Sequence, residues 1–143
     1  MIDDRAAIHP DARISSDVSI GPFTIVEAGV TIGSGTRVGS HVVIREGTRL
    51  GQDNHIYSFA SIGEDPQFAG YSGETTVLEV GDHNVIREYV TLNRGSPAGT
   101  GTTQIGSHNF LMAYCHIAHD SVLGDHIVFA NGASLAGHVV VGD

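Results

Sequence analysis

"ISSDVSIGPFTIVEAGVTIGSGTRVGSHVVI", residues 14–44, carries an aliphatic residue at every sixth position. These residues are Ile14, Ile20, Val26, Ile32, Val38 and Ile44. A fixed repeat of this kind is the sequence signature of a solenoid, in which short structural units stack on one another and share a continuous core. The abundance of glycine and the absence of tryptophan agree with many short strands joined by tight corners.

The same period runs through the rest of the chain, with two interruptions. The aliphatic positions are Ile8, Ile14, Ile20, Val26, Ile32, Val38, Ile44, Leu50, Ile56, Ile62, then Val80, Ile86, Leu92, then Ile105, Leu111, Ile117, Leu123, Phe129, Leu135 and Val141. Four positions after each of them the residue is usually small or β-branched, and glycine often follows the aliphatic directly. We therefore expect one domain over residues 1–143.

The pattern resembles the hexapeptide-repeat β-helix, in which three hexads form one triangular coil and each coil stacks on the last at about 4.8 Å, the spacing of β-strands. The resemblance implies an all-β fold, a left-handed parallel β-helix of about eight coils. In such a coil the aliphatic residue points inward and the small residue four positions later fills the same layer.

Two segments break the period and are expected to leave the coil as loops. Residues 64–79, "EDPQFAGYSGETTVLE", place Phe68 and Glu74 where aliphatic residues are due, and residues 95–104, "GSPAGTGTTQ", are rich in glycine and threonine. A solenoid needs only short corners, so loops of this length point to function.

The charge and the termini argue against several classes of partner. All seven positive side chains are arginine, against sixteen carboxylates, and the net charge of −9 would repel nucleic acid. No apolar run approaches the about 20 residues that span a bilayer, and the N-terminus resembles no secretory signal. With one cysteine, no internal disulfide is possible. We therefore expect a cytoplasmic protein without a membrane span.

The single cysteine and the nine histidines do not by themselves mark a site. Cys115 falls on an inward position, where a buried thiol is inert, which argues against a cysteine nucleophile. All nine histidines fall on outward positions, so exposure does not distinguish them. The default interpretation, a solvated or interface residue, is adopted for His9, His41, His55, His108 and His126.

His119 differs from the others in its neighbours one coil away. With about 18 residues per coil, Gly137 is expected above His119, and His138 above Asp120. This arrangement brings together an imidazole, a carboxylate and an unobstructed backbone N–H. A base with a nearby oxyanion donor is what acyl transfer to a hydroxyl requires.

A zinc site is the alternative use of these histidines. One branch of this fold binds zinc through three histidines from two adjoining subunits, with a pair five residues apart on one chain. Here the close pair, His116 and His119, is three apart, and the histidine-glycine-cysteine context of that branch is missing. The sequence therefore predicts no metal site.

Several segments together resemble one enzyme family. These are "IHPDA" (8–12), "IGEDPQ" (62–67), "VGDHNVIREYVTLNRG" (80–95), "IGSHNFLMAYCHIAHDSVLGD" (105–125) and "LAGHVVVGD" (135–143). They are similar to the UDP-N-acetylglucosamine O-acyltransferases that begin lipid A assembly, and the resemblance covers the whole chain. It implies transfer of a 3-hydroxyacyl group from acyl carrier protein to the 3-hydroxyl of the glucosamine unit.

The resemblance also implies roles for individual residues. His119 would be the general base, Asp120 would orient or polarise it, and the N–H of Gly137 would face the thioester oxygen. The positions that would contact substrate are Gln67, Asn93, His116 and His138. The family uses no cofactor beyond the acyl carrier protein thioester, and it forms homotrimers with each active site between neighbouring subunits.

Two departures from the family pattern keep the acceptor open. Phe68 follows Gln67 where the family commonly has an aspartate, and the lysine slightly further on is missing, so the acceptor is either a hydroxyl or the amine of a 3-amino sugar nucleotide. Asn93 stands where some relatives carry a histidine.

Relatives also continue for several coils and a C-terminal helical domain, so we expect this chain to be an N-terminal portion with weak or no turnover alone.

Two other functions compete with this interpretation. The related N-acyltransferase that acts later in the same pathway usually has an extra N-terminal domain and an asparagine where this chain has Asp120. A non-catalytic β-helix scaffold is the alternative of a different class, and it would retain its function without His119.

Overall fold

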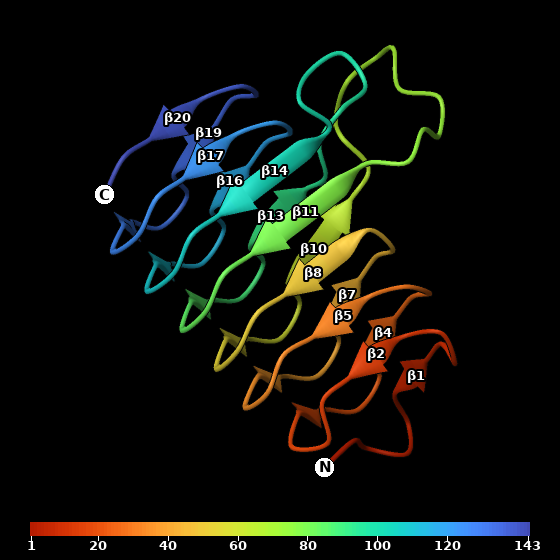
Figure 1. Ribbon diagram of the computed structural model, residues 1–143. Helices are drawn as coiled ribbons and strands as arrows, with labels where there is room; N and C mark the ends of the chain where they lie inside the picture. The colour runs from red at the N-terminus through yellow and green to blue at the C-terminus, as the bar shows by residue number, and fades with distance from the viewer.

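The structure is a computed structural model that describes residues 1–143, and it consists of short parallel strands wound into a triangular coil. Twenty strands form three sheets, and the chain passes from one sheet to the next in strict rotation (Figure 1). The fold is the expected left-handed parallel β-helix. It contains no helix long and apolar enough to cross a membrane.

The strands of each sheet follow one another at every third position in the chain. The first sheet contains β1 (Ala7–Ile8), β4 (Ile25–Val26), β7 (Val43–Ile44), β10 (Ser61–Glu64), β13 (Thr91–Asn93), β16 (His116–Ile117) and β19 (Ser134–Leu135). The second contains β2 (Arg13–Ile14), β5 (Thr31–Ile32), β8 (Thr48–Leu50), β11 (Val77–Val80), β14 (Thr102–Ile105), β17 (Val122–Leu123) and β20 (Val140–Val141). The third contains β3 (Ser19–Ile20), β6 (Arg37–Val38), β9 (His55–Ile56), β12 (Val85–Ile86), β15 (Phe110–Leu111) and β18 (Val128–Phe129).

The register of the strands confirms the counting from the sequence. His116 pairs with Ser134 and Ile117 with Leu135, so neighbouring coils are 18 residues apart (134 − 116). Two sheets have seven strands each, which makes seven coils instead of the expected eight. The difference arises because the expected number of coils counted the residues of the two loops as parts of coils.

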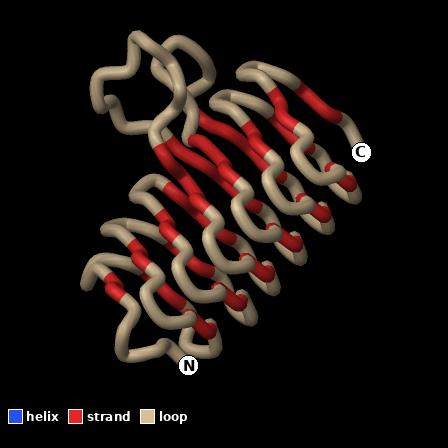
Figure 2. Tube along the Cα trace, turned by 180° about the vertical axis from the view of Figure 1, so that it is seen from behind, coloured by secondary structure: helices blue, strands red, loops and turns tan.

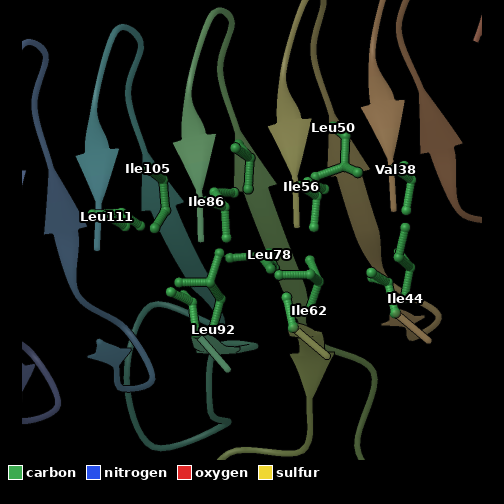
Figure 3. Close-up of a cluster of buried hydrophobic side chains, with 14 of the residues drawn as sticks. Val38, Ile44, Leu50, Ile56, Ile62, Leu78, Ile86, Leu92, Ile105 and Leu111 are labelled. Carbon is green, nitrogen blue, oxygen red and sulfur yellow. The ribbon is translucent and has the colours of Figure 1, made fainter. Parts of the chain in front are cut away.

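The core is a stack of the aliphatic residues that define the repeat. From Ile20 to Ile62 and from Val80 to Leu123 each of these side chains is buried, and Figure 3 shows several of them stacked inside the coil. The first two and the last three, from Ile8 to Ile14 and from Phe129 to Val141, are partly buried and pack against this core. Leu78, which the six-residue count did not single out, is fully buried beside them.

Three buried asparagines form a ladder that the repeat did not reveal. Asn54, Asn84 and Asn109 occupy successive coils at the position where the repeat has a small residue. The side-chain oxygens of Asn54 and Asn84 each accept the backbone N–H of the next asparagine, at 2.9 Å. The side-chain amides of Asn84 and Asn109 donate to the carbonyls of Gly106 and Gly124. The ladder therefore satisfies backbone groups that the corner leaves without strand partners.

Two exposed columns of rings run along two of the corners. The first stacks Phe23, His41, Phe59, Tyr89 and Tyr114, with centroids 5.0–5.3 Å apart. The second stacks His83, His108 and His126 at 4.9 Å. All these residues have positive φ and occupy the same turn position in successive coils. His41, His108 and His126 are thus corner residues, in agreement with their default interpretation.

Glycine is required where the corners of successive coils approach most closely. A Cβ at Gly33 would lie 2.6 Å from the carbonyl carbon of Gly51, one coil further along. Since real side chains do not approach backbone this closely, the glycines that follow the aliphatic residues permit the strand spacing of the stack.

Both loops leave the coil at the corner between the first and second sheets, and they lie side by side in both views (Figures 1 and 2). They are shorter than the sequence suggested. Strand β10 continues to Glu64 and β11 begins at Val77, so the first loop is residues 65–76 instead of 64–79. Strands β13 and β14 leave residues 94–101 for the second loop instead of 95–104.

Candidate active site

His119 and Asp120 lie at the corner from which the two loops emerge. They follow strand β16, and Asp120 takes a left-handed conformation with φ of 61°. Aspartate tolerates this conformation better than most residues, and the N–H of Asp120 donates to Thr103 Oγ1 at 2.9 Å. The turn aims the carboxylate of Asp120 at its neighbour, and His119 Nδ1 lies 2.8 Å from Asp120 Oδ2.

The carboxylate of Asp120 is buried and surrounded by donors. Ser96 donates its N–H at 3.0 Å to Oδ1 and its hydroxyl at 2.6 Å to Oδ2, and the N–H of Gly101 donates to Oδ1 at 3.0 Å. Burial alone would raise the pKa of Asp120, but hydrogen bonds from Ser96, His119 and Gly101 outweigh it and hold the pKa below the usual value. Asp120 is therefore ionised at neutral pH.

The charge on Asp120 fixes the state of His119. An ionised carboxylate only accepts hydrogen bonds, so the proton of the neutral imidazole resides on Nδ1. The lone pair is then on Nε2, the nitrogen that faces away from Asp120. His119 is in the tautomer that a general base needs, and an ionised partner stabilises the imidazolium formed when it accepts a proton.

Gly137 and His138 lie one coil above, as the counting predicted. A Cβ at Gly137 would lie 2.6 Å from Cε1 and 2.8 Å from Nε2 of His119, so only glycine fits over this ring. The N–H of Gly137 makes no backbone hydrogen bond and is free to donate. His138 Nε2 lies 4.0 Å from Asp120 Oδ2, and its ring stands edge-on to His119 at 5.0 Å.

His116 lies on strand β16 and is oriented by the strand beside it. Its Nδ1 makes a 2.7 Å hydrogen bond with Thr91 Oγ1 of β13. Burial lowers the pKa of His116, and the nearby His119 lowers it further, which favours the neutral ring at physiological pH. His116 is thus held in a fixed orientation beside the candidate base.

The first loop brings an aromatic ring to the candidate base. The ring of Phe68 lies 6.0 Å from that of His119, whereas Gln67 is exposed on the same loop. Arg94, which is buried, anchors the loop by donating to Gly63 O at 2.6 Å, Asp65 Oδ1 at 2.6 Å and the hydroxyl of Tyr71 at 2.8 Å. The loop therefore has a defined position over the corner.

Asn93 is buried at the end of strand β13, and its Oδ1 has no hydrogen-bond partner. A buried carbonyl oxygen without a donor costs free energy unless a partner supplies one. Asn93 is thus the one predicted substrate contact with a buried side-chain atom that lacks a hydrogen-bond partner.

Cys115 occupies the core, as expected. It is fully buried, its Sγ lies 3.1 Å from Ala130 O, and burial raises the pKa of the thiol. A protonated, buried sulfur of this kind is not a nucleophile.

Several contributors to the site were not found from the sequence, among them Ser96, Gly101, Arg94, and Phe68 as a neighbour of His119. All four belong to the two loops, where the 18-residue counting does not apply. Unusual loop length was the only available signal, and it identified the segments without identifying the residues.

The atoms of His119, Asp120 and His138 that could bind a metal lie within 4.8 Å of one another. The carboxylate in this cluster already accepts hydrogen bonds from Ser96, Gly101 and His119. Hydrogen bonding thus accounts for the arrangement of Asp120 without an ion, and the cluster fits proton transfer.

Comparison with known proteins gives a consistent set of relatives. A family model described as bacterial transferase hexapeptide (six repeats) matches residues 11–46 and 102–137. The Acyl-[acyl-carrier-protein]--UDP-N-acetylglucosamine O-acyltransferase of Alkalilimnicola ehrlichii is 66% identical over 142 residues, which is 99% of this chain and 55% of that protein. The protein of the same name from Halorhodospira halophila is 60% identical over 94% of this chain and 52% of its own length.

A solved structure of LpxA from Acinetobacter baumannii superimposes with a TM-score of 0.98 at 52% identity, covering 99% of this chain and 55% of that one. The chain thus spans about half the length of the relatives it matches. Over that half, the repeat and both loops lie within the region of similarity.

Proposed function

We propose that this chain, which belongs to the bacterial transferase hexapeptide family, transfers a 3-hydroxyacyl group from acyl carrier protein to the 3-position of UDP-N-acetylglucosamine, the first step of lipid A biosynthesis. The observation that carries the proposal is the 2.8 Å contact between His119 Nδ1 and the buried carboxylate of Asp120, next to Gly137, whose N–H makes no backbone hydrogen bond. The names of the relatives supply the acyl carrier protein donor and the UDP-N-acetylglucosamine acceptor. The 3-hydroxyacyl group, the 3-position and the pathway come from the sequence resemblance.

In the proposed reaction, Nε2 of His119 removes the proton from the acceptor hydroxyl as that oxygen attacks the thioester carbonyl carbon. The new C–O bond forms and the carbonyl electrons move to the oxygen, which accepts a hydrogen bond from the N–H of Gly137. When the carbonyl re-forms, the C–S bond breaks and the thiolate takes the proton from the imidazolium of His119. The products are the ester and free acyl carrier protein thiol.

Asp120 favours the step in which His119 accepts the proton, because that step forms an ion pair between the imidazolium and the carboxylate. Proton transfer to His119 creates a positive charge 2.8 Å from an ionised, largely desolvated carboxylate. The unpaired Oδ1 of Asn93 and the oriented ring of His116 support assigning these two residues to acceptor binding. Gln67 and His138 are assigned to it by the sequence resemblance alone.

The partners follow from the same proposal. The donor is an acyl carrier protein thioester, which places the reaction in the cytoplasm, and no further cofactor is proposed. We also propose that the working unit is a homotrimer with each site between neighbouring subunits. The acceptor is UDP-N-acetylglucosamine or its 3-amino analogue.

An acyl transfer assay with matched variants tests the proposal. Purified protein is incubated with 3-hydroxyacyl carrier proteins and either sugar nucleotide, and product is followed by mass spectrometry. His119→Ala should reduce kcat/KM by about 10²- to 10⁴-fold, the usual contribution of a general base. His126→Ala, which changes an exposed ring of the histidine column, is the control and should retain activity. Because this chain alone is expected to show weak or no turnover, the same comparison is made in the full-length gene product, where no product, or equal activity of His119→Ala, would refute the proposal.

A further inference from the structure

We propose that Ser96, in the second loop, is a positioning residue for the catalytic base: it holds Asp120 in the one orientation that presents Oδ2 to His119 Nδ1. The effect on catalysis rests on the proposed acyl transfer. The effect on the imidazole does not, because it is a property of the folded chain alone.

Ser96 directs its two donors at the same carboxylate. Its N–H lies 3.0 Å from Oδ1 and 3.1 Å from Oδ2 of Asp120, and its hydroxyl lies 2.6 Å from Oδ2. The residue is completely buried although it belongs to a loop. A hydroxyl that is buried and donates only to a charged acceptor forms a short, strong hydrogen bond.

Hydrogen bonds hold Asp120 both at its backbone N–H and at its carboxylate, and together they define the orientation of the side chain. At the backbone, its N–H is held by Thr103 Oγ1 at 2.9 Å. At the carboxylate, the N–H of Gly101 holds Oδ1 at 3.0 Å, and the hydroxyl of Ser96 shares Oδ2 with the imidazole of His119. Without the Ser96 hydroxyl, Oδ2 is free to turn away from His119 and toward the imidazole of His138, 4.0 Å away.

The second loop packs closely against the carboxylate of Asp120. A Cβ at Gly99 would collide with both the carboxyl group of Asp120 and the ring of His138. The N–H of Gly99 donates to the carbonyl of Ser96 at 3.2 Å, which closes the turn beneath the carboxylate. The second loop is therefore built around Asp120, and Ser96 is its point of contact with the oxygen that His119 uses.

The tautomer of His119 is the direct readout, and it requires no substrate. In the parent protein the neutral ring should carry its proton on Nδ1, which ¹⁵N and ¹³C NMR of labelled histidine detects. Ser96→Ala should change this to a mixture of the Nδ1–H and Nε2–H forms. Asp120→Asn provides the reference for a ring without its carboxylate, and Ser96→Thr, which keeps the hydroxyl, should restore the parent tautomer.

The kinetics of acyl transfer are the second readout. Ser96→Ala should lower kcat/KM by about 10- to 100-fold, the range expected when a catalytic group is misaligned, with a smaller change in KM. Ser96→Thr, which keeps the hydroxyl, should restore the parent kcat/KM. Ser107→Ala is the control, since that hydroxyl only accepts the N–H of Asp82 on another corner.

The two readouts separate the possible outcomes. If His119→Ala transfers acyl groups as well as the parent while Ser96→Ala still shifts the tautomer, the proposed function is refuted and the positioning role is supported. An unchanged tautomer and an unchanged kcat/KM in a folded Ser96→Ala protein would overturn the role of Ser96. Circular dichroism and thermal unfolding establish that each variant is folded.

Discussion

At the scale of single residues, the site needs a glycine at position 137 as much as it needs the imidazole of His119, because a side chain there would collide with that ring. Gly137→Ala places a methyl group 2.6 Å from Cε1 of His119 and must displace the ring. We expect kcat/KM to fall by about 100-fold, because the base moves relative to the reacting hydroxyl, while stability changes little. Gly142→Ala is the matched control, since nothing lies within 4 Å of its Cβ. Parent-like activity of Gly137→Ala would contradict the placement of the base.

The buried charge of Asp120 predicts a specific pH dependence of stability. Because its pKa is lower in the folded state, the stabilisation is complete above the unfolded-state pKa of about 3.9 and is lost as the pH falls through the folded pKa. Asp120→Asn, which does not titrate, should be less stable by about 1.5–3 kcal/mol at pH 6, the cost of hydrogen bonds to a charged group. The difference from the parent should shrink toward pH 3.

Urea unfolding at both pH values measures this effect. The exposed Asp4→Asn is the control, and its stability difference should be small throughout. A difference for Asp120→Asn that stays constant between pH 6 and pH 3 would show that folding does not lower the pKa of Asp120.

Counting 18 residues per coil was sufficient to place the residues that follow the six-residue repeat. Gly137 was placed above His119, and His138 above Asp120, because each coil uses 18 residues wherever the corner is short. Ser96 and Phe68 were beyond this reasoning. Their positions depend on how a loop folds back over the corner, and no periodic pattern encodes that.

At the scale of elements, the first loop depends on one buried side chain. Arg94→Met removes the donors to Gly63 O, Asp65 and Tyr71. We expect a loss of about 2–4 kcal/mol, since a buried carbonyl and a carboxylate lose charged partners. We also expect proteolytic cleavage within residues 65–76 that the parent protein resists.

Arg49→Met is the control for this variant, because it removes an exposed ion pair with Glu79 that contributes about 0–1 kcal/mol. If Arg94→Met matched Arg49→Met in both stability and protease resistance, Arg94 would not be the anchor of the loop.

The boundaries of the two loops were predicted less accurately than the repeat, because a strand beside a loop can extend beyond its hexad. Val77 and Leu78 were assigned to the loop because the aliphatic residue in phase with the repeat is Val80. Leu78 is nevertheless fully buried and pairs with Thr48 and Thr103 in a four-residue strand that is longer than most in the coil. A strand can extend past its hexad when the corner beside it is replaced by a loop.

At the scale of the whole molecule, each coil contacts only its neighbours, so stability depends on position along the axis. Ile56→Ala, in a central coil where the side chain is fully buried, should cost about 2–5 kcal/mol. Ile14→Ala, in the second sheet near the N-terminus, should cost less because Ile14 is only partly buried. Urea unfolding measures the loss of stability in each variant. Equal losses would show that the cost does not depend on position along the axis.

The fold class was predictable because one rule is repeated twenty times, and each repetition places an aliphatic residue inward. The handedness came from resemblance to known sequences, since the general preference for right-handed crossovers points the other way. The asparagine ladder was not predictable, because polar residues at the inward positions broke the pattern that identified the others.

The corner between the first and second sheets has a consequence for how such proteins diverge. After the first loop, β11 still pairs in register with β8 and β14, so twelve extra residues are accommodated without moving the coils on either side (Leu78 − Thr48 = 30, compared with 18). A change in the length of the first loop therefore alters what surrounds His119 and leaves in place the coils that carry His119 and Asp120. The second loop is constrained more tightly, because it supplies Ser96 and Gly101 to the carboxylate of Asp120. The first loop is thus the part of this corner at which relatives can differ while keeping the same coils.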